Sequence, residues 1–379
     1  MKYLHGADQL RDLTPLLSGK RLGLVTNHTG LTSQLIPTID VLRDMYDLRK
    51  LYAPEHGVRG AIQAGGAVPD EVDPDSGLPV YSLYGAHAAG PEAFEGIDCV
   101  LFDIQDLGAR FYTYMYTLID AMKRCAQVGV PVIVLDRYNP LGLTRAEGTL
   151  LDEHFSSGVG RYELPTRHAL SMGEFARYAN ERKGIGCELR IIPCQGLTRK
   201  MDFRHCGVPL ALPSTNIPTW DAALCYIGTC LFEGTNLSEG RGTTKPFEMI
   251  GAPWLSAQKL AREMNALNLA GVRFRGACFT PTFSKHAGQV CQGVQLHITD
   301  PDAFDPFRSG LMLLHTIRRN HPEFCFLPAH APGGHPFIDL LVGGDWLRDE
   351  HFEPESFIRE QQARVDAFQQ TMTRYYLYE

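Results

Sequence analysis

The sequence lacks most of the short motifs that identify common enzyme classes. No G-x-G-x-x-G follows its first apolar run, no G-x-x-x-x-G-K-[ST] occurs, and neither G-x-S-x-G nor H-E-x-x-H is present. These absences remove the main sequence support for dinucleotide binding, a phosphate-binding loop, a serine nucleophile on an elbow and a zinc protease site. The ten cysteines show no C-x-x-C spacing. We therefore expect buried free thiols, which favour a reducing compartment.

Two further absences concern targeting and partners. No run of 18 apolar residues exists, so we expect no membrane span. The first residues do not have the pattern of a secretory signal, which predicts a cytoplasmic protein unless a leader has been removed. The net charge of −7 gives no reason to expect nucleic acid as a partner. With 44% hydrophobic and 21% charged residues, the 379-residue chain has the composition of a globular protein.

The first 140 residues contain a repeated pattern of apolar, β-branched runs that end in polar residues. The runs span residues 21–30, 48–60, 99–114 and 131–140. Near-continuous apolar runs are typical of parallel strands that are buried on both faces. Helices are expected between them, one capped by Thr32 or Ser33 and running to Tyr46, another over residues 113–128. This order predicts an α/β fold with a parallel sheet and helices on both faces.

The remaining chain continues with mixed elements. A capping box at Ser171–Glu174 opens a helix, residues 186–194 form a strand, and Thr219 caps a helix over residues 220–232. Beyond residue 251, helices at 256–267 and 307–320 alternate with strands at 272–280 and 293–299. We interpret this part as a smaller α+β domain. The predicted division is residues 1–230 and residues 231–379.

Polar side chains follow the ends of the predicted strands. In open α/β sheets ligands bind beyond the carboxyl ends of the strands. We therefore expect one pocket to gather Asn27, His28, Glu55, His56, Asp103, Gln105, Asp106, Arg110, Asp136 and Arg137. The Gly- and Pro-rich segment 57–85 follows Glu55 and is predicted to be either a lid over this pocket or a surface loop.

Glu55 is the first candidate for catalysis. A half-buried carboxyl group at a strand end suits a general acid; the alternative is a salt bridge to Arg59 or Arg110. His56 is a candidate for binding substrate or for tuning Glu55. Two carboxylates flanking a bond are the usual requirement for glycoside hydrolysis.

The partner carboxylate is left open between several residues. Asp103 and Asp106 flank Gln105 at the third strand end, and one of the aspartates more plausibly caps the turn at Leu107–Gly108. Glu239 in the Gly-rich loop 232–248 is another candidate. A metal site built from Asp103, Asp106 and His56 is a weaker alternative.

Two arginines and a tyrosine suit a sugar acid. Arg110 or Arg241 can form paired hydrogen bonds with a carboxylate. Tyr112 can stack on a sugar face, although a single tyrosine at such a position more often belongs to the core than to a binding site.

Several long strings resemble one known family, the exo-β-N-acetylmuramidases. They are GKRLGLVTNHTG (19–30), APEHGVRG (53–60), FDIQDLGARFYTY (102–114), DRYNPLG (136–142), PSTNIPT (213–219), FEGTNLSEGRGTTKPFE (232–248) and PTFSKHAGQ (281–289). The resemblance implies a Rossmann-like N-terminal domain holding the pocket and a smaller C-terminal domain covering it. It also implies release of N-acetylmuramic acid from the non-reducing end of β-1,4-linked peptidoglycan fragments. The glutamate of A-P-E-H-G, which is Glu55, corresponds to the catalytic one.

This resemblance completes the set of predicted site residues. The catalytic candidates are Glu55, Asp103, Asp106 and Glu239. The candidates for substrate binding are Asn27, His56, Arg59, Gln105, Arg110, Tyr112, Asn216 and Arg241. No cofactor or metal is expected. The alternative functions are a non-catalytic muropeptide-binding protein and a metal-dependent hydrolase that uses the same pocket.

Overall fold

A seven-stranded sheet forms the core of the N-terminal part of the protein. The computed structural model describes residues 3–86, 88–211 and 213–379. In sheet order the strands are β3 (Glu71–Val72), β4 (Pro79–Ser82), β2 (Asp47–Ala53), β1 (Arg21–Thr26), β5 (Cys99–Asp103), β6 (Val132–Leu135) and β7 (Leu189–Ile192). All neighbours pair in parallel except β3 and β4. Without β3, the chain order is 3-2-1-4-5-6, the doubly wound Rossmann order, with its switch point between β1 and β5.

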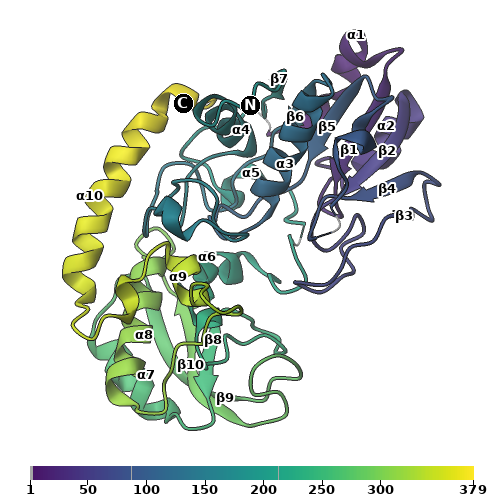
Figure 1. Ribbon diagram of the computed structural model, residues 1–379. Coiled ribbons are helices and arrows are strands. Elements are labelled where there is room, and N and C mark those ends of the chain that lie inside the picture. The colour runs from purple at the N-terminus through teal and green to yellow at the C-terminus, as the bar shows by residue number, and fades with distance from the viewer. Residues whose placement is uncertain (1–2, 87, 212) are drawn as a thin grey trace.

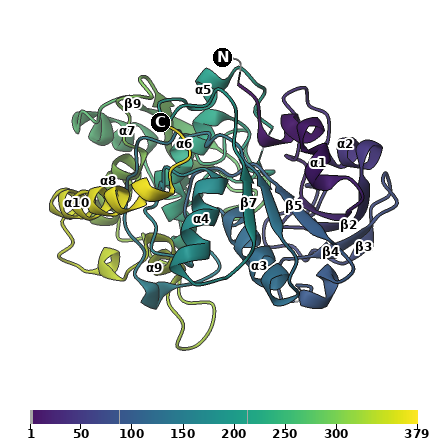
Figure 2. The ribbon, with the colours of Figure 1, turned by 90° about the horizontal axis from the view of Figure 1, so that it is seen from above.

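Both faces of this sheet are covered, as the apolar runs predict. Successive side chains of a strand point to opposite faces. Leu24 and Leu101 therefore pack with the side chains of α1 (Thr14–Leu17) and α2 (Thr38–Met45), while Val100 packs with those of α3 (Tyr114–Gln127) and α4 (Met172–Arg182). Figure 2 shows α1 and α2 on the side of the sheet away from α3. The predicted α/β fold is confirmed.

The predicted helix ends are confirmed at α4 but not at α2. Ser171 Oγ accepts from the Glu174 N–H, and the Glu174 carboxylate accepts from the Ser171 N–H, so the capping box is formed. By contrast, α2 begins only at Thr38. The Thr32 hydroxyl accepts the N–H groups of the next turn instead, so the expected cap at Thr32 or Ser33 is wrong.

The C-terminal part is built on a three-stranded antiparallel sheet. Its order is β8 (Met249–Ala252), β10 (Cys291–Ile298) and β9 (Val272–Phe279). The helices of this part are α6 (Trp220–Thr229), α7 (Ala257–Ala266), α8 (Pro306–Asn320), α9 (Phe337–Val342) and α10 (Pro354–Met372); a short α5 (Phe203–Cys206) precedes them. The predicted pattern of helices and strands after residue 251 is confirmed. The sequence pattern did not predict β8, α9 or α10.

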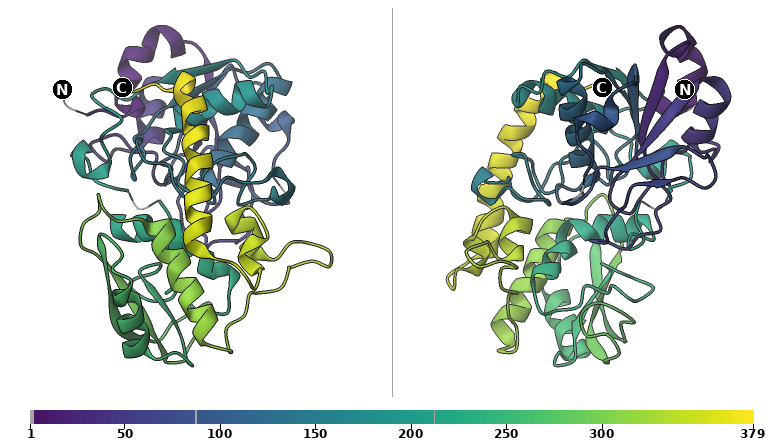
Figure 3. Two further views of the ribbon diagram at one scale, coloured as in Figure 1. Left: turned by 90° about the vertical axis from the view of Figure 1, so that its left-hand side faces the viewer. Right: turned by 45° about the vertical axis from the view of Figure 1, so that its right-hand side comes forward.

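The last residues of the chain return to the N-terminal part. Helix α10 runs alongside both parts and ends near α4 (Figures 1 and 3). Beyond it, the Tyr378 hydroxyl donates to the buried Asp136 carboxylate at 2.6 Å, and the Leu377 N–H donates to Glu174 at 2.9 Å. The two parts are thus joined by the C-terminal segment as well as by the chain that leads into α6.

Two composition-based expectations can be compared with the structure. All ten cysteines are free thiols, and eight of them are buried. None of the described helices is both long and apolar enough to cross a lipid bilayer.

Candidate active site

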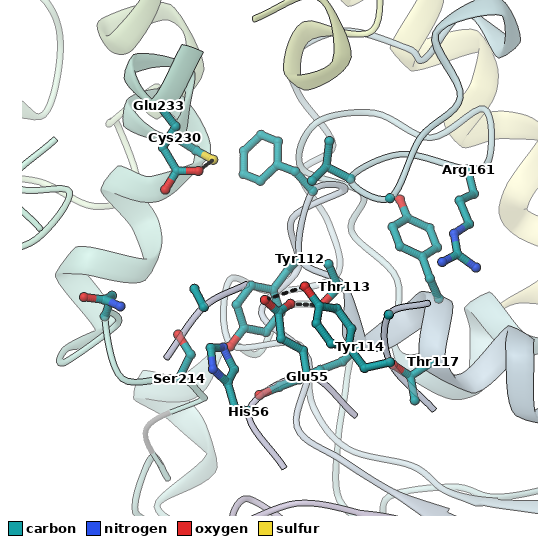
Figure 4. A pocket seen from close by; sticks show the side chains of 18 of the residues that line it. Glu55, His56, Tyr112, Thr113, Tyr114, Thr117, Arg161, Ser214, Cys230 and Glu233 are labelled. Carbon is teal, nitrogen blue, oxygen red and sulfur yellow. Dashed lines mark hydrogen bonds between the residues drawn. The ribbon is translucent and has the colours of Figure 1, made fainter. Parts of the chain in front are cut away.

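A cavity of about 500 Å³ lies between the two parts of the protein, at the carboxyl ends of β2 and β5. Glu55 and His56 enter it from the residues after β2, and residues 111–114, 116 and 117 enter it from the segment before α3 and the first turn of that helix. Ser214 and Asn216 line it from the segment before α6. Glu233 and Arg241 line it from the C-terminal part. Figure 4 shows Glu55 between Glu233 on one side and Arg161 on the other.

Three donors hold the carboxylate of Glu55. Its Oε1 atom accepts from the Gly65 N–H at 3.0 Å and from the Tyr84 hydroxyl at 3.1 Å. Its Oε2 atom accepts from the Thr113 hydroxyl at 2.8 Å (Figure 4). These contacts fix both oxygens of a half-buried carboxyl group inside the cavity. None of the donors is a cation, so the predicted alternative of a salt bridge to Arg59 or Arg110 is wrong.

The turn after β2 aims Glu55 into the cavity. His56 and Gly57 both have positive φ angles, 73° and 78°. Such a conformation is uncommon for a residue with a side chain. The His56 Nδ1–H donates to the Ile62 carbonyl at 2.6 Å, which holds the ring in place at the cavity wall.

Segment 57–85 is neither a plain lid nor a plain surface loop. It contains β3 and β4, and β4 extends the main sheet beside β2. Arg59 donates two hydrogen bonds to Asp73, at 2.8 and 2.7 Å, within this segment. Arg59 therefore braces the segment and does not line the cavity.

Aromatic rings form much of the cavity wall. Tyr112 and Tyr114 meet edge to face at 5.0 Å, and Tyr226 packs edge to face against Phe111 at 5.0 Å and Phe247 at 4.6 Å. Burial raises the pKa of Tyr112 and of Tyr226 well above the usual value, so both phenols are neutral. Apolar ring faces with polar tips suit the two faces of a sugar ring.

A second carboxylate faces the cavity from the C-terminal part. Glu233 lies on the 3₁₀ turn Cys230–Gly234, which follows α6. Arg241 Nε donates a hydrogen bond to the Glu233 carboxylate at 2.9 Å. Burial raises the pKa of Glu233, and the positive charge of Arg241 opposes this shift. Behind this pair, Glu239 lies 3.4 Å from Arg241 and 2.8 Å from Lys285 Nζ. Glu239 is buried outside the cavity lining, where it supports Arg241.

The two aspartates at and after the end of β5 are engaged outside the cavity lining. Asp103 is fully buried, and Arg137 donates to it at 2.6 and 2.9 Å, with a further hydrogen bond from Thr38. Asp106 accepts the Gly108 N–H at 2.7 Å, as predicted for a residue that caps this turn. Neither aspartate lines the cavity, so the structure gives both a part in holding the β5 loop.

Arg110 is the clearest departure from the predicted site. Its side chain is completely buried and donates to backbone carbonyls, including those of Leu164 and Leu341 at 2.8 Å each. Burial lowers its pKa to about 10. Arg110 cannot reach a ligand in the cavity, because every direction from its guanidinium is occupied by protein.

The predicted convergence on one pocket is therefore only partly right. Of the ten strand-end residues, Glu55 and His56 line the cavity. The other eight lie outside its lining: Asn27, His28, Asp103, Gln105, Asp106, Arg110, Asp136 and Arg137. Gln105 donates to the carbonyls of Asp106 and Tyr138, and Asn27 accepts from Thr29, so their polar groups hold backbone in place. Tyr112, Asn216 and Arg241, predicted from other segments, do line it.

Several cavity residues were missed by sequence reasoning. Tyr84, Thr113 and Glu233 surround the space around Glu55, and a polar stripe on α3 extends from it. The stripe consists of Thr117, Asp120 and Arg124, which share one helical face because they are three and four residues apart. A polar stripe at helical spacing on an otherwise buried helix was the available signal.

The cavity has two unlike ends. Tyr226, Cys230 and Phe247, which are 7%, 1% and 1% exposed, form the wall beside Glu233 and Arg241, and we call this wall the closed end. Thr117, Asp120, Arg124 and Arg161 form what we call the α3 arm. The side chains of Asp120 and Arg161 are 21% and 37% exposed, so this arm opens to solvent.

Metal ligands are not grouped in the described part of the chain. Within residues 3–86, 88–211 and 213–379, no three His, Cys, Asp or Glu side chains lie close enough to hold an ion. The set considered from the sequence, Asp103, Asp106 and His56, is not brought together.

Comparison with known proteins assigns the chain to a family. Residues 22–221 match the family model described as exo-β-N-acetylmuramidase NamZ, N-terminal, and residues 224–378 match its C-terminal counterpart. A peptidoglycan β-N-acetylmuramidase NamZ from Bacillus subtilis (strain 168) is 42% identical over 97% of this chain and 89% of its own.

Solved structures with the same fold come from Bacteroides fragilis NCTC 9343. Two crystal structures of DUF1343 family proteins superpose with TM-scores of 0.90 and 0.79, at 33% and 28% identity, covering 100% of this chain and 99% of theirs. With both halves of the chain matched by the same family, this protein belongs to the NamZ exo-β-N-acetylmuramidase family.

Proposed function

We propose that this protein is a glycoside hydrolase that releases N-acetylmuramic acid from the non-reducing end of β-1,4-linked peptidoglycan fragments. The observation that carries the proposal is the placement of Glu55, fixed by three donors in the cavity between the two parts of the protein. The 42% identical relative named as a peptidoglycan β-N-acetylmuramidase supports the substrate class.

Two carboxyl groups have different roles in the reaction. Glu55 donates a proton to the oxygen of the leaving sugar as the glycosidic bond breaks. A water molecule then adds to the anomeric carbon, and the proton that it loses passes to a carboxylate of the pair, which restores the enzyme. Glu233, across the cavity, is the second carboxylate and stabilises the positive charge that develops on the sugar ring. Among the described carboxylates that line the cavity, Asp120 is the remaining one. Like Glu233 it pairs with an arginine, Arg161 at 2.7 Å, but it lies on the α3 arm, where we place the leaving sugars.

The two ends of the cavity account for an exo mode of action. The terminal sugar occupies the closed end, and the rest of the chain leaves through the α3 arm toward solvent. A pocket closed behind the terminal sugar excludes binding in the middle of a glycan. Arg241 at the closed end is the cation that recognises the lactyl carboxylate, which distinguishes N-acetylmuramic acid from N-acetylglucosamine. Arg241 already pairs with Glu233 and Glu239, so the discrimination comes from the hydrogen bond that the lactyl carboxylate adds and that N-acetylglucosamine cannot make.

The decisive variant is Glu55→Gln. Glutamine keeps the size of the side chain but cannot donate an acidic proton, so kcat for a chromogenic muramic acid glycoside is expected to fall about 100- to 10,000-fold. Glu95→Gln, an exposed position away from the cavity, is the matched control and is expected to keep wild-type rates. Both variants are compared with the wild type by thermal unfolding. Wild-type turnover in Glu55→Gln would overturn the role.

The same assay separates the alternative functions. A non-catalytic muropeptide-binding protein would bind the glycoside without releasing its chromophore. A metal-dependent hydrolase would lose its rate after treatment with a chelator and regain it when metal is returned. The proposed carboxylate mechanism predicts turnover that a chelator does not change.

A further inference from the structure

The α3 arm carries a positive charge that the chemistry at Glu55 does not use. Asp120 and Arg161 form an ion pair at 2.7 Å, and the Arg161 guanidinium lies 5.4 Å from the Tyr116 ring centre. Arg124 lines the same arm, and no described carboxylate pairs with its guanidinium. The two arginines and one aspartate leave this arm with one positive charge in excess.

The position of this charge excludes a role with the terminal sugar. Thr113, which contacts Glu55, and Arg124 are eleven residues apart on α3, which corresponds to about 16 Å along the helix axis. Long helical side chains lean toward the helix N-terminus, so the Arg124 guanidinium reaches back to about the level of Asp120. The Arg124 guanidinium is then still about 10 Å along the helix axis from Thr113. The lactyl group of a sugar whose anomeric carbon lies at Glu55 is too short to span about 10 Å.

We propose that Arg124, with Arg161 lining the same arm, forms a binding site for a carboxylate carried by the second sugar beyond the bond that is cleaved. The inference depends on the proposed function, because it requires the glycan to leave through the α3 arm. In a glycan of alternating N-acetylglucosamine and N-acetylmuramic acid, the first sugar beyond the cleaved bond is neutral and the second bears a lactyl carboxylate. The ligand is therefore an anionic sugar, and its partner is a guanidinium in a partly exposed groove.

The test compares two trisaccharides that differ in one carboxylate. Both begin with N-acetylmuramic acid and N-acetylglucosamine; the third sugar is N-acetylmuramic acid in the acidic substrate and N-acetylglucosamine in the neutral one. For the wild-type protein we expect kcat/KM to be about tenfold higher on the acidic substrate, since a charge-assisted hydrogen bond of this kind forms at the arm. Because the arm is exposed to solvent, the preference is expected to decrease at high salt.

Arg124→Gln is the diagnostic variant, and Lys123→Gln is its control. The Arg124→Gln substitution is expected to reduce the ratio of the two kcat/KM values to about one. Lys123 is exposed on the same turn of α3 and does not line the cavity, so its replacement makes the same change of charge and is expected to preserve the preference. Thermal unfolding of both variants checks that α3 is intact.

The outcomes distinguish this site from the function on which it depends. Equal wild-type kcat/KM values on the two trisaccharides, or a preference that survives in Arg124→Gln, would overturn the carboxylate site while leaving the glycosidase intact. Failure of the wild type to release N-acetylmuramic acid from either substrate, or from the disaccharide, would overturn the proposed function itself.

Discussion

Replacing Thr113 by valine is expected to reduce activity without loosening the fold. The Thr113 hydroxyl is the one described donor to Oε2 of Glu55, at 2.8 Å, whereas Oε1 has two donors. Glu55 is protonated when it acts as the general acid, and a hydrogen bond to a neutral group contributes about 0.5–1.5 kcal/mol, so its loss is expected to lower kcat/KM about 2- to 10-fold. Tyr84→Phe leaves the Gly65 N–H on Oε1 and is expected to have a smaller effect.

The local structure makes this substitution a clean one. Thr113 occupies the N-cap position of α3, but its side chain caps no backbone group there, so valine removes no helix cap. Valine also has nearly the same shape as threonine. Thermal unfolding is therefore expected to change little, and Thr113→Ser, which restores the hydroxyl, is expected to restore kcat/KM.

The assay measures kcat and KM for the muramic acid glycoside across these variants and in a double-mutant cycle with Glu55→Gln. If Thr113 acts by positioning Glu55, its replacement has little further effect once Glu55 is glutamine. The reasoning would be refuted if Thr113→Val kept wild-type kcat/KM, or if its effect were undiminished in the Glu55→Gln background.

The remaining predictions concern pH. Burial raises the pKa of Glu233, and Glu233 acts only when ionised, so kcat/KM is expected to fall with decreasing pH through a midpoint above the ordinary glutamate value of 4.5; a midpoint at or below 4.5 would contradict this. Burial also raises the pKa of Asp136 in the folded state. Ionisation of this carboxyl group therefore lowers the free energy of unfolding as the pH rises. The hydrogen bond that the Tyr378 hydroxyl donates to Asp136 offsets part of that loss. Tyr378→Phe is therefore expected to lower the free energy of unfolding in urea by about 1.5–3 kcal/mol at neutral pH and by less in acid, where Asp136 is protonated; a loss independent of pH would count against this account.

The sheet could be predicted because its strands are buried on both faces. Strand β5, Cys99–Asp103, is buried at every position, so its sequence is apolar without alternation. The elements that were missed carry weaker signals. Strand β4, Pro79–Ser82, has only four residues and begins with proline, and it is a strand because β2 pairs with it. Its pairing is a tertiary effect that no local pattern contains.

From the sequence we could predict that the site lies at the ends of the strands, but not which of the residues there line the cavity. Glu55 follows β2 and points into the cavity, whereas Asp103 ends β5 and pairs with Arg137, which is 34 residues away in the sequence. Both are acidic residues after an apolar run, and nothing local distinguishes them. What distinguishes them is whether the fold brings a cation to the carboxylate, and that depends on the neighbouring strand.

One of the segments that resemble the family, residues 102–114, contains both a residue that contacts Glu55 and a residue with a purely structural role, Arg110. The string 102–114 contains Thr113, which contacts Glu55, and Arg110, which never reaches the cavity. Arg110 instead donates to carbonyls of the N-terminal part and to the Leu341 carbonyl of α9. Leu341 is itself part of the cavity wall. A guanidinium can hold several carbonyls at once because its donors diverge in a rigid plane, which lysine cannot reproduce. Arg110 therefore links the two parts of the protein, and it holds a residue of the cavity wall without lining the cavity itself.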